Sequence, residues 1–215
     1  MKYSQSVCAL NLYSSLNIID ELVASGMKFI HIDFMDSFYV ENFGFSYEMA
    51  EFLINRYPEI NFDAHLMVKK PLRLIEKLQN IGFKTIFLPA NEINQNDFIN
   101  TSKNYPNLSF GIMLEAKNNP QDYKNLIINS KKILLMTINK IGGTGVQLDQ
   151  KLFEKVKEIK NINQHITIYS DGGLRVNNSD LFYNNEIDIA VGGSIIFSFE
   201  NPKSFYKWWK EKYDS

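Results

Sequence analysis

The segment Phe29-Ile-His-Ile-Asp-Phe-Met-Asp36 decides how the rest of this chain is interpreted. Apolar and polar residues alternate along it, which is typical of a β-strand. Because side chains two residues apart in a strand point to the same side, His31, Asp33 and Met35 share one face. An imidazole and a carboxylate on one face suit a divalent metal ion or an acid/base pair. For this segment alone, a His–Asp hydrogen bond that satisfies two polar side chains at a strand end is an equally good interpretation.

A second segment, Asn61-Phe-Asp-Ala-His-Leu-Met67, repeats this pattern further along the chain. The period of two places Asp63, His65 and Met67 on one face of a predicted strand. Two strands therefore each present a histidine, an acidic residue and a methionine on a single side.

The whole chain alternates predicted strands with predicted helices. We predict strands over 6–12, 30–34, 61–67, 84–88, 110–114, 133–138, 166–170 and 189–191. Predicted helices span 16–24, 46–56, 71–80, 94–103, 120–129, 149–160 and 202–212, with Ser14 or Ser15 as the N-cap of the first and a short helix after Ser194. Strand–helix alternation without a linker or a charge block predicts one domain, residues 1–215, folded as a TIM (β/α)8 barrel. A doubly wound open sheet is the competing α/β architecture, but it would not bring the polar strand ends into one ring.

The predicted barrel brings the polar strand ends together, because the carboxyl ends of all its strands meet on one face. Asp171 follows the strand predicted over 166–170, so it should converge with His31, Asp33 and His65. Two histidines and two carboxylates are a suitable ligand set for zinc, iron(II) or manganese. The sequence therefore predicts a divalent metal site at this face.

Glycines follow three of the predicted strands. The loops concerned contain Gly142, Gly143 and Gly145, then Gly172 and Gly173, and finally Gly193 with Ser194. Such loops let backbone N–H groups approach an anion closely, and a phosphate can sit where a strand leads into a helix. Ordinary turns explain the same glycines equally well, so the loops alone do not show whether a phosphate binds there.

Composition limits the class of protein. The chain has 215 residues, of which 45% are hydrophobic and 22% charged, as expected for a soluble globular protein with one core. A net charge of -1 argues against a dedicated nucleic-acid binder. The single cysteine, Cys8, excludes an internal disulfide, and its apolar surroundings predict a small core residue rather than a nucleophile. Because no long apolar stretch and no signal-like N-terminus is present, we expect no membrane span and a cytoplasmic location.

Taken in order, the motifs resemble the successive signatures of the ribulose-phosphate 3-epimerase family. They are His31-x-Asp33-x-Met35-Asp36, Asp63-x-His65-Leu66-Met67, Met136-Thr137 with its glycine loop, Asp171-Gly172-Gly173 and Gly193-Ser194. The segment Ser6-Val7-Cys8-Ala9-Leu10-Asn11 is similar to the opening strand of that family. The series covers most of the chain and is far more specific than any one of its members.

This resemblance implies a fold, an activity and a cofactor. The fold is a TIM barrel, and the cofactor is one divalent metal ion held by His31, Asp33, His65 and Asp171, with zinc preferred to iron(II), manganese or cobalt. The activity is that of an isomerase of carbohydrate metabolism, which inverts C3 of a ketose phosphate such as D-ribulose 5-phosphate in the pentose phosphate reactions. Asp33 and Asp171 would move protons on opposite faces of an enediolate. Self-association, as a dimer or a hexamer, is expected on the same basis.

The resemblance also implies the residues that contact the substrate. Met35, Met67 and Met136 would cover the reacting carbon, and the phosphate would bind at the loops after the last two strands. The full set implied is Ser6, His65, Met35, Met67, Met136, Gly142, Gly143, Gly145, Gly172, Gly173, Gly193 and Ser194. Arg175 lies close by in sequence, but we expect a surface charge at a helix start there.

Several segments depart from the family pattern. The loop after residue 138 reads Lys140-Ile141-Gly142-Gly143-Thr144-Gly145-Val146-Gln147 where the family has Pro-Gly-Phe-Gly-Gly-Gln, and Leu88-Pro89-Ala90-Asn91-Glu92 stands where a His and a Glu are common. Glu115-Ala116 replaces Asn-Pro, and Ser37 and Glu41 occur where Gly and Pro are usual. These changes leave the metal ligands intact but alter the walls, so the substrate could instead be a hexulose phosphate or a sugar for a surface glycan.

Two other classes of function remain open. A barrel lyase or decarboxylase would need a catalytic lysine at a strand end, and no predicted strand ends in one. A sugar-phosphate binder without activity would keep the fold but would have no use for a paired acid and base.

Overall fold

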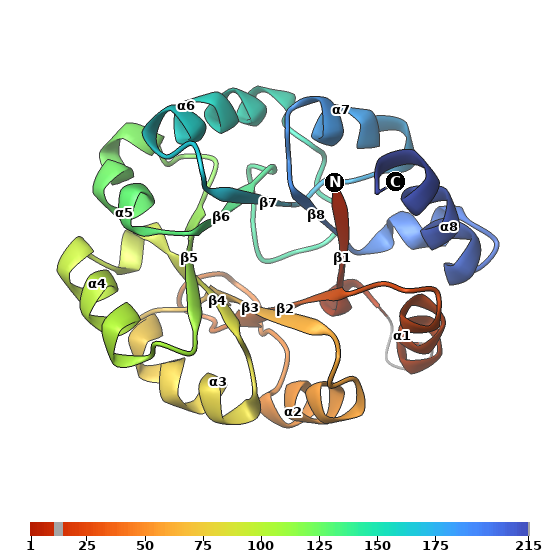
Figure 1. Cartoon of the computed structure of the whole chain (residues 1–215), viewed down its shortest axis with the longest axis horizontal. Helices are drawn as coiled ribbons and strands as arrows, with labels where there is room; N and C mark the ends of the chain where they lie inside the picture. Colours follow the sequence, from red (N-terminus) through yellow and green to blue (C-terminus); the bar gives the residue numbers. More distant parts are fainter. Residues whose placement is uncertain (11–14, 215) are drawn as a thin grey trace.

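The computed structural model describes residues 1–10 and 15–214, and these form a closed barrel of eight parallel strands ringed by helices (Figure 1). The strands are hydrogen-bonded in chain order from β1 to β8, and β8 pairs with β1 to close the ring. The predicted TIM barrel, a single domain, is therefore confirmed. No helix among the described residues is long and apolar enough to cross a membrane.

The elements alternate around the ring. The strands are β1 (Lys2–Ser6), β2 (Phe29–Met35), β3 (Asn61–Met67), β4 (Thr85–Pro89), β5 (Ser109–Leu114), β6 (Lys132–Met136), β7 (Thr167–Asp171) and β8 (Ile189–Gly192). The α-helices are α1 (Ser15–Ala24), α2 (Tyr47–Arg56), α3 (Ile75–Ile81), α4 (Gln95–Asn104), α5 (Lys124–Asn129), α6 (Glu154–Ile162), α7 (Ser179–Asn184) and α8 (Pro202–Tyr213). Short 3-10 turns precede or replace the first turn of several helices, among them η1 (Val7–Ala9) and η6 (Val176–Asn178).

The core forms because each strand alternates between two buried faces. The outward side chains of β2, Ile30, Ile32 and Phe34, are almost fully buried beneath the helices. A separate apolar cluster, which includes Phe87 and Leu134, fills the barrel interior. Burial on both faces is the usual environment of a parallel sheet, and it explains why most of these strands are rich in apolar residues.

The first strand lies earlier in the chain than predicted. The prediction placed it over 6–12, whereas β1 ends at Ser6 and the chain then enters η1. Residues 11 and 12, and the candidate N-cap Ser14, lie outside the described residues. The polar sequence Lys-Tyr-Ser-Gln-Ser of β1 did not suggest a strand, yet Tyr3 packs outward on Phe205 with ring centroids 4.7 Å apart. Ser6 points inward to Asp33, so this strand has a polar inner face.

Helix α7 was not predicted. It has six residues, and asparagines precede and end it at Asn177, Asn178 and Asn184. Asparagine disfavours helix interiors, so the local sequence gives little helical signal. The helix forms because Phe182, which is fully buried, anchors it on the barrel.

Candidate active site and metal centre

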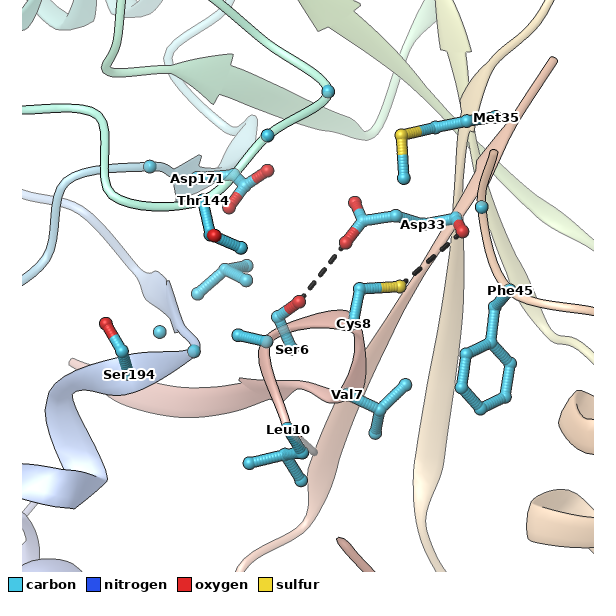
Figure 2. A pocket seen from close by; sticks show the side chains of 18 of the residues that line it. Ser6, Val7, Cys8, Leu10, Asp33, Met35, Phe45, Thr144, Asp171 and Ser194 are labelled. Carbon is cyan, nitrogen blue, oxygen red and sulfur yellow. Dashed lines mark hydrogen bonds between the residues drawn. The ribbon is translucent and has the colours of Figure 1, made fainter. Parts of the chain in front are cut away.

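A cavity of about 750 Å³ opens at the carboxyl ends of the strands (Figure 2). Its size lies within the range of small-molecule sites. All but one of the substrate contacts expected from the sequence line it, namely Ser6, Met35, Met67, Met136, Gly142, Gly143, Gly145, Gly172, Gly173, Gly193 and Ser194. The exception is His65, which is fully buried and lies behind the cavity wall.

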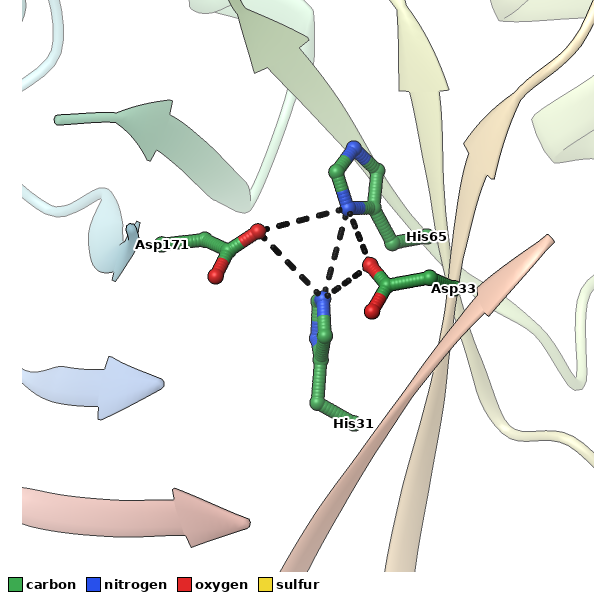
Figure 3. Close-up of side chains that lie close together, drawn as sticks. All are labelled: His31, Asp33, His65 and Asp171. Atoms are coloured by element: carbon green, nitrogen blue, oxygen red, sulfur yellow. Dashed lines mark hydrogen bonds and ion pairs between the residues drawn. The ribbon is translucent and has the colours of Figure 1, made fainter. Parts of the chain in front are cut away.

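Four side chains converge beside this cavity, as the sequence predicted (Figure 3). His31 and Asp33 come from β2, His65 from β3 and Asp171 from β7. The two carboxylates approach the imidazoles from opposite sides. The nearest atoms are His31 Nε2, His65 Nδ1, Asp33 Oδ1 and Asp171 Oδ2, which all lie within 4.8 Å of one another.

The spacing of these atoms fits a tetrahedral metal ion. Ligands held at about 2.0–2.1 Å from zinc stand about 3.3–3.4 Å apart at the corners of a tetrahedron. Here His31 Nε2 lies 3.2 Å from Asp33 Oδ1 and 3.3 Å from His65 Nδ1. Asp171 Oδ2 lies 3.9 Å from His31 Nε2 and 3.6 Å from His65 Nδ1, and His65 Nδ1 lies 3.0 Å from Asp33 Oδ1. The donor set and its dimensions could therefore hold a divalent cation.

Strand register explains why the side chains from β2 and β3 meet. β2 and β3 pair without offset, so His31 lies beside Asp63 and Asp33 lies beside His65. Side chains on adjacent strands at paired positions project together. The two repeated motifs found in the sequence thus become one cluster through a simple in-register pairing.

The carboxylates and imidazoles of the cluster perturb one another strongly. Burial lowers the pKa of His31, but the charges of Asp63 and Asp33 outweigh this and hold it well above its ordinary value. Burial raises the pKa of Asp33, yet the charge and hydrogen bonding of His31 outweigh this and keep it far below its usual range. Burial, reinforced by the charge of Asp33, raises the pKa of Asp171. The two aspartates therefore occupy unequal environments, as an acid and a base require.

Three residues around the cluster hold its members in place. Asp63 Oδ1 lies 2.5 Å from His31 Nδ1, which leaves Nε2 to face the other ligands. The Ser6 hydroxyl donates to Asp33 Oδ2 at 3.1 Å. The Thr137 hydroxyl donates to the backbone oxygens of Asp171 and Gly172, at 3.0 and 2.6 Å. Sequence reasoning gave Asp63 no role, although in-register pairing of the two motifs would have placed it next to His31.

Glycine is required by the backbone at two positions in the loops after β7 and β8. Gly172 has a φ of 105°, and a Cβ there would lie 2.6 Å from Ile138 Cγ1. A Cβ on Gly193 would lie 2.2 Å from Cβ of Ala9. Any larger residue would push these loops apart, so the backbone amides keep their positions only with glycine.

Cys8 is not the core residue that the sequence predicted. It is half-buried in η1, lines the cavity, and its Sγ donates to the backbone oxygen of Asp33 at 3.7 Å. The prediction is wrong because the chain turns away from the strand at Val7. Burial, and then the charge of Asp33, raises the pKa of the thiol, so the thiol stays protonated as expected of a residue that is not a nucleophile.

Hydrogen bonds join three of the loops that contain departures from the family pattern, those after β2, β4 and β5. In the β2 loop (residues 36–44), the Tyr39 hydroxyl donates to Glu115 Oε1 at 2.5 Å. Asn91 Nδ2 donates to the same oxygen at 2.8 Å. The ring of Tyr39 packs against the cluster that contains Met67 and Met136. Glu115 and Asn91, which sequence reasoning left without a role, thus fasten the β2 loop.

The β2 loop also touches the β6 loop (residues 137–149). Asn42 Nδ2 donates to the backbone oxygen of Gly142 at 2.8 Å. A Cβ on Gly142 would come within 2.7 Å of Val40, so the two loops are in close contact. Together they form one wall of the cavity.

Sequence comparison finds one family across most of the chain. The model of the ribulose-phosphate 3 epimerase family matches residues 2–197. A ribulose-phosphate 3-epimerase of Helicobacter pylori is 30% identical over 183 residues, which are 83% of each chain. The enzyme of the same name from Bacillus subtilis is 22% identical over 208 residues, covering 94% of this chain and 95% of that one.

Structural comparison agrees on the fold. The 3-keto-L-gulonate-6-phosphate decarboxylase of Vibrio cholerae superimposes with a TM-score of 0.74 at 13% identity, covering 100% of this chain and 97% of that one. The 3-hexulose-6-phosphate synthase of Salmonella typhimurium gives a TM-score of 0.71 at 14% identity, covering 96% of this chain and 95% of that one. At such identities the likeness supports the barrel and says nothing about the reaction.

Proposed function

The chain belongs to the ribulose-phosphate 3-epimerase family, and from this premise we propose that it is a metal-dependent ketose-phosphate 3-epimerase that inverts C3 by proton transfer between two aspartates. The observation that carries the proposal is the convergence of His31, Asp33, His65 and Asp171 beside the cavity. D-ribulose 5-phosphate and D-xylulose 5-phosphate are the substrate pair that the family name suggests.

Inversion at C3 needs a base on one face of the carbon and an acid on the other. Asp33 and Asp171 come from strands on different sides of the barrel mouth and point toward each other across the histidines (Figure 3). We assign removal of the C3 proton to one of them and delivery to the opposite face to the other, with the roles exchanged in the reverse direction. General acid–base catalysis of this kind contributes roughly 10²–10⁴-fold to the rate.

The same four side chains are proposed to hold the cation, with zinc preferred and iron(II), manganese or cobalt as alternatives. When bound, a divalent ion supplies Lewis-acid stabilisation of the negative charge that develops on the substrate oxygens. His31 is prepared for this task because Asp63 occupies its Nδ1. Ser6 holds the second oxygen of Asp33, which fixes the plane of that carboxylate.

The rest of the cavity supports a sugar phosphate. Met35, Met67 and Met136 give an apolar cover near the aspartates that would keep water from the charged intermediate. The amides around Gly172, Gly173, Gly193 and Ser194 are proposed to receive the phosphate at the other end.

The size of the ketose is the open part of the proposal. Glu115 accepts hydrogen bonds from Asn91 and Tyr39, and both Asn91 and Glu115 lie in segments that depart from the family pattern, so a hexulose phosphate or a precursor of a surface glycan is the alternative to the pentulose. We also propose a cytoplasmic location. We propose self-association as a dimer or hexamer, and gel filtration with light scattering would test this oligomeric state.

A panel assay in deuterium oxide tests the proposal. Pentulose, hexulose and heptulose phosphates are incubated with protein loaded with zinc, iron(II), manganese or cobalt, and label at C3 is read by NMR. We expect label and the C3 epimer from at least one ketose phosphate, and a loss of roughly 10²-fold or more in the variants Asp33→Asn and Asp171→Asn.

The matched control is Asp122→Asn, an exposed acid outside the site, which should keep full activity. Metal content and thermal midpoint are measured for every variant. If the wild-type protein exchanges no C3 proton with any ketose phosphate, the epimerase proposal is wrong and a non-catalytic binder takes its place. A lyase or decarboxylase is disfavoured, because no lysine stands among the described residues that line the cavity.

A further inference from the structure

Among the described residues that line the cavity, one side chain is positively charged. The proposed chemistry does not use it. That residue is Arg175, which follows the Asp171-Gly172-Gly173 turn after β7. The charged side chains that line the same cavity are otherwise the carboxylates of Asp33, Glu48 and Asp171. Sequence reasoning expected a surface charge at a helix start. Arg175 does precede η6, but it is half-buried in the cavity wall.

We propose that Arg175 is a specificity-determining residue that binds the phosphate group of the substrate and thereby selects phosphorylated over unphosphorylated sugars. This inference deepens the proposed epimerase function and rests on it. The backbone amides of the glycine loops can hold phosphate oxygens, but they bring no full positive charge to a cavity whose other charged side chains are acidic.

The backbone of Arg175 is fixed by a neighbouring asparagine. The Arg175 amide donates to Asn178 Oδ1 at 2.7 Å, and Asn178 Nδ2 donates to the backbone oxygen of Gly173 at 2.8 Å. Asn178 thus joins the glycine turn to the arginine. Gly172 and Gly173 have positive φ angles of 105° and 77°. The turn that they form fixes the position of the Arg175 Cα, from which the side chain extends.

The guanidinium is held but not neutralised. Its Nη1 donates to the backbone oxygen of Leu174 at 2.7 Å. Within residues 1–10 and 15–214, no carboxylate lies within ion-pair distance of it. Arg56 shows the ordinary alternative, since its Nη2 lies 2.8 Å from Asp20 Oδ2 on the surface. A guanidinium carries several N–H donors in a planar fork that matches phosphate geometry, and most of those of Arg175 remain for a ligand.

Arg175 matters because the other charged side chains of the cavity are acidic and would repel a phosphate. A sugar phosphate is close to a dianion at neutral pH, and its approach to carboxylates in a partly enclosed cavity is unfavourable. The proposed metal ion offsets the two aspartates at one end. Arg175, on the turn that follows Asp171, supplies a charge at the glycine loops. An unphosphorylated ketose would gain nothing from it.

The test measures phosphate binding apart from turnover. Inorganic phosphate is titrated into the metal-loaded wild-type protein, Arg175→Gln and Arg175→Lys by isothermal calorimetry. Because hydrogen bonds to charged groups are among the stronger ones, we expect Arg175→Gln to weaken phosphate binding roughly tenfold to a hundredfold. Arg175→Lys should fall between, since a lysine keeps the charge but loses the fork. The control Arg73→Gln removes a charge from an exposed arginine outside the cavity and should bind phosphate as the wild type does.

Steady-state kinetics on the ketose phosphate identified by the panel provide the second readout. KM for the phosphorylated sugar should rise in Arg175→Gln, whereas turnover of the unphosphorylated ketose should not change. Tight phosphate binding by Arg175→Gln, at an unchanged thermal midpoint and metal content, would overturn the proposal, and so would a wild-type protein that binds no phosphate. If phosphate binding depends on Arg175 but no ketose phosphate is turned over, the epimerase function fails while the anion site stands.

Discussion

The Asp63 carboxylate decides which nitrogen of His31 can bind a metal ion. With Asp63 Oδ1 2.5 Å from Nδ1, the ring proton is held there and Nε2 is left free to face the cluster. Asp63 is itself buried, and its Oδ2 has no hydrogen-bond partner in the described part of the chain. A buried acid kept at this cost is consistent with a role toward the proposed ion rather than with folding alone.

Replacing Asp63 by asparagine should weaken metal binding. An introduced asparagine carries no charge and offers Nδ1–H of His31 only a neutral amide oxygen, which makes the imidazole a weaker metal ligand. We expect the metal dissociation constant to rise about tenfold to a hundredfold in Asp63→Asn, as for other residues that orient a ligand. Competition with a chromophoric chelator measures it, with Asp122→Asn as the control. An unchanged dissociation constant would show that the charge of Asp63 does not strengthen His31 as a metal ligand.

The candidate site could be predicted at the level of individual residues only where a side chain lies on a predicted strand or directly after one. His31, Asp33, His65 and Asp171 were predicted because strand periodicity and a barrel sufficed to bring them together. Glu115 and Asn91 could not be predicted, because their partner Tyr39 lies on an irregular loop whose path no periodicity reveals. The place of Arg175 in the cavity wall could not be predicted either, since it depends on the turn in which Asn178 joins Gly173 to the Arg175 amide.

Among the elements, the β2 loop depends on side-chain hydrogen bonds more than on its own backbone. Asp36 accepts hydrogen bonds from the amides of Tyr39 and Lys69, both at 2.7 Å, which fixes the start of the loop. The Tyr39–Glu115 hydrogen bond fixes its middle, across the barrel mouth. Burial, and then the hydrogen bond and charge of Glu115, raises the pKa of Tyr39, so the hydroxyl remains a donor at any physiological pH.

Tyr39→Phe should loosen this loop without removing its packing. The ring still covers the methionine cluster, but Glu115 loses a donor, and we expect the free energy of unfolding to fall by about 1–2 kcal/mol. Urea denaturation followed by circular dichroism measures the change. Tyr183→Phe, at a tyrosine 51% exposed, is the matched control and should change stability by less than about 0.5 kcal/mol. Equal effects of the two substitutions would mean that the hydrogen bond does not hold the loop.

Elements were predicted well where they are long and apolar and poorly where they are short or polar. The predicted strand over 61–67 matches β3 at both ends, because its apolar positions recur with period two. β1 was misplaced because its inner face is polar, and a local pattern cannot show that the inside of a barrel accepts serine. α7 was missed because its stability comes from the packing of Phe182 in the core and not from the helix propensity of its residues.

For the molecule as a whole, the barrel closes only where the first and last strands pair, and we call this place the seam. β1 pairs with β8, and α8 packs over that seam. Trp209 is fully buried there, 5.2 Å from the ring of Tyr3, and its Nε1 donates to the backbone oxygen of Met1 at 3.3 Å.

Trp209→Ala should therefore destabilise the entire barrel. Loss of a fully buried tryptophan leaves a large cavity, and we expect the free energy of unfolding to drop by about 3–5 kcal/mol. Trp208→Ala is the matched control, because Trp208 is only half-buried, and its effect should be clearly smaller. Guanidinium titration of both variants provides the comparison. Similar losses from the two variants would contradict the idea that α8 seals the ring through Trp209.

The placement of the four ligand side chains has a consequence for folding itself. Two of them lie on β2, one on β3 and one on β7, so all four meet only after the ring has closed and brought Asp171 to the other three. A cation held by all four would act as a brace across the barrel mouth, and it would bind the native chain far better than the unfolded one. Slippage of β3 along β2 by even one residue would turn His65 away from Asp33. The amount of tightly held metal would then report the fraction of molecules in which every strand has found its correct neighbour and alignment.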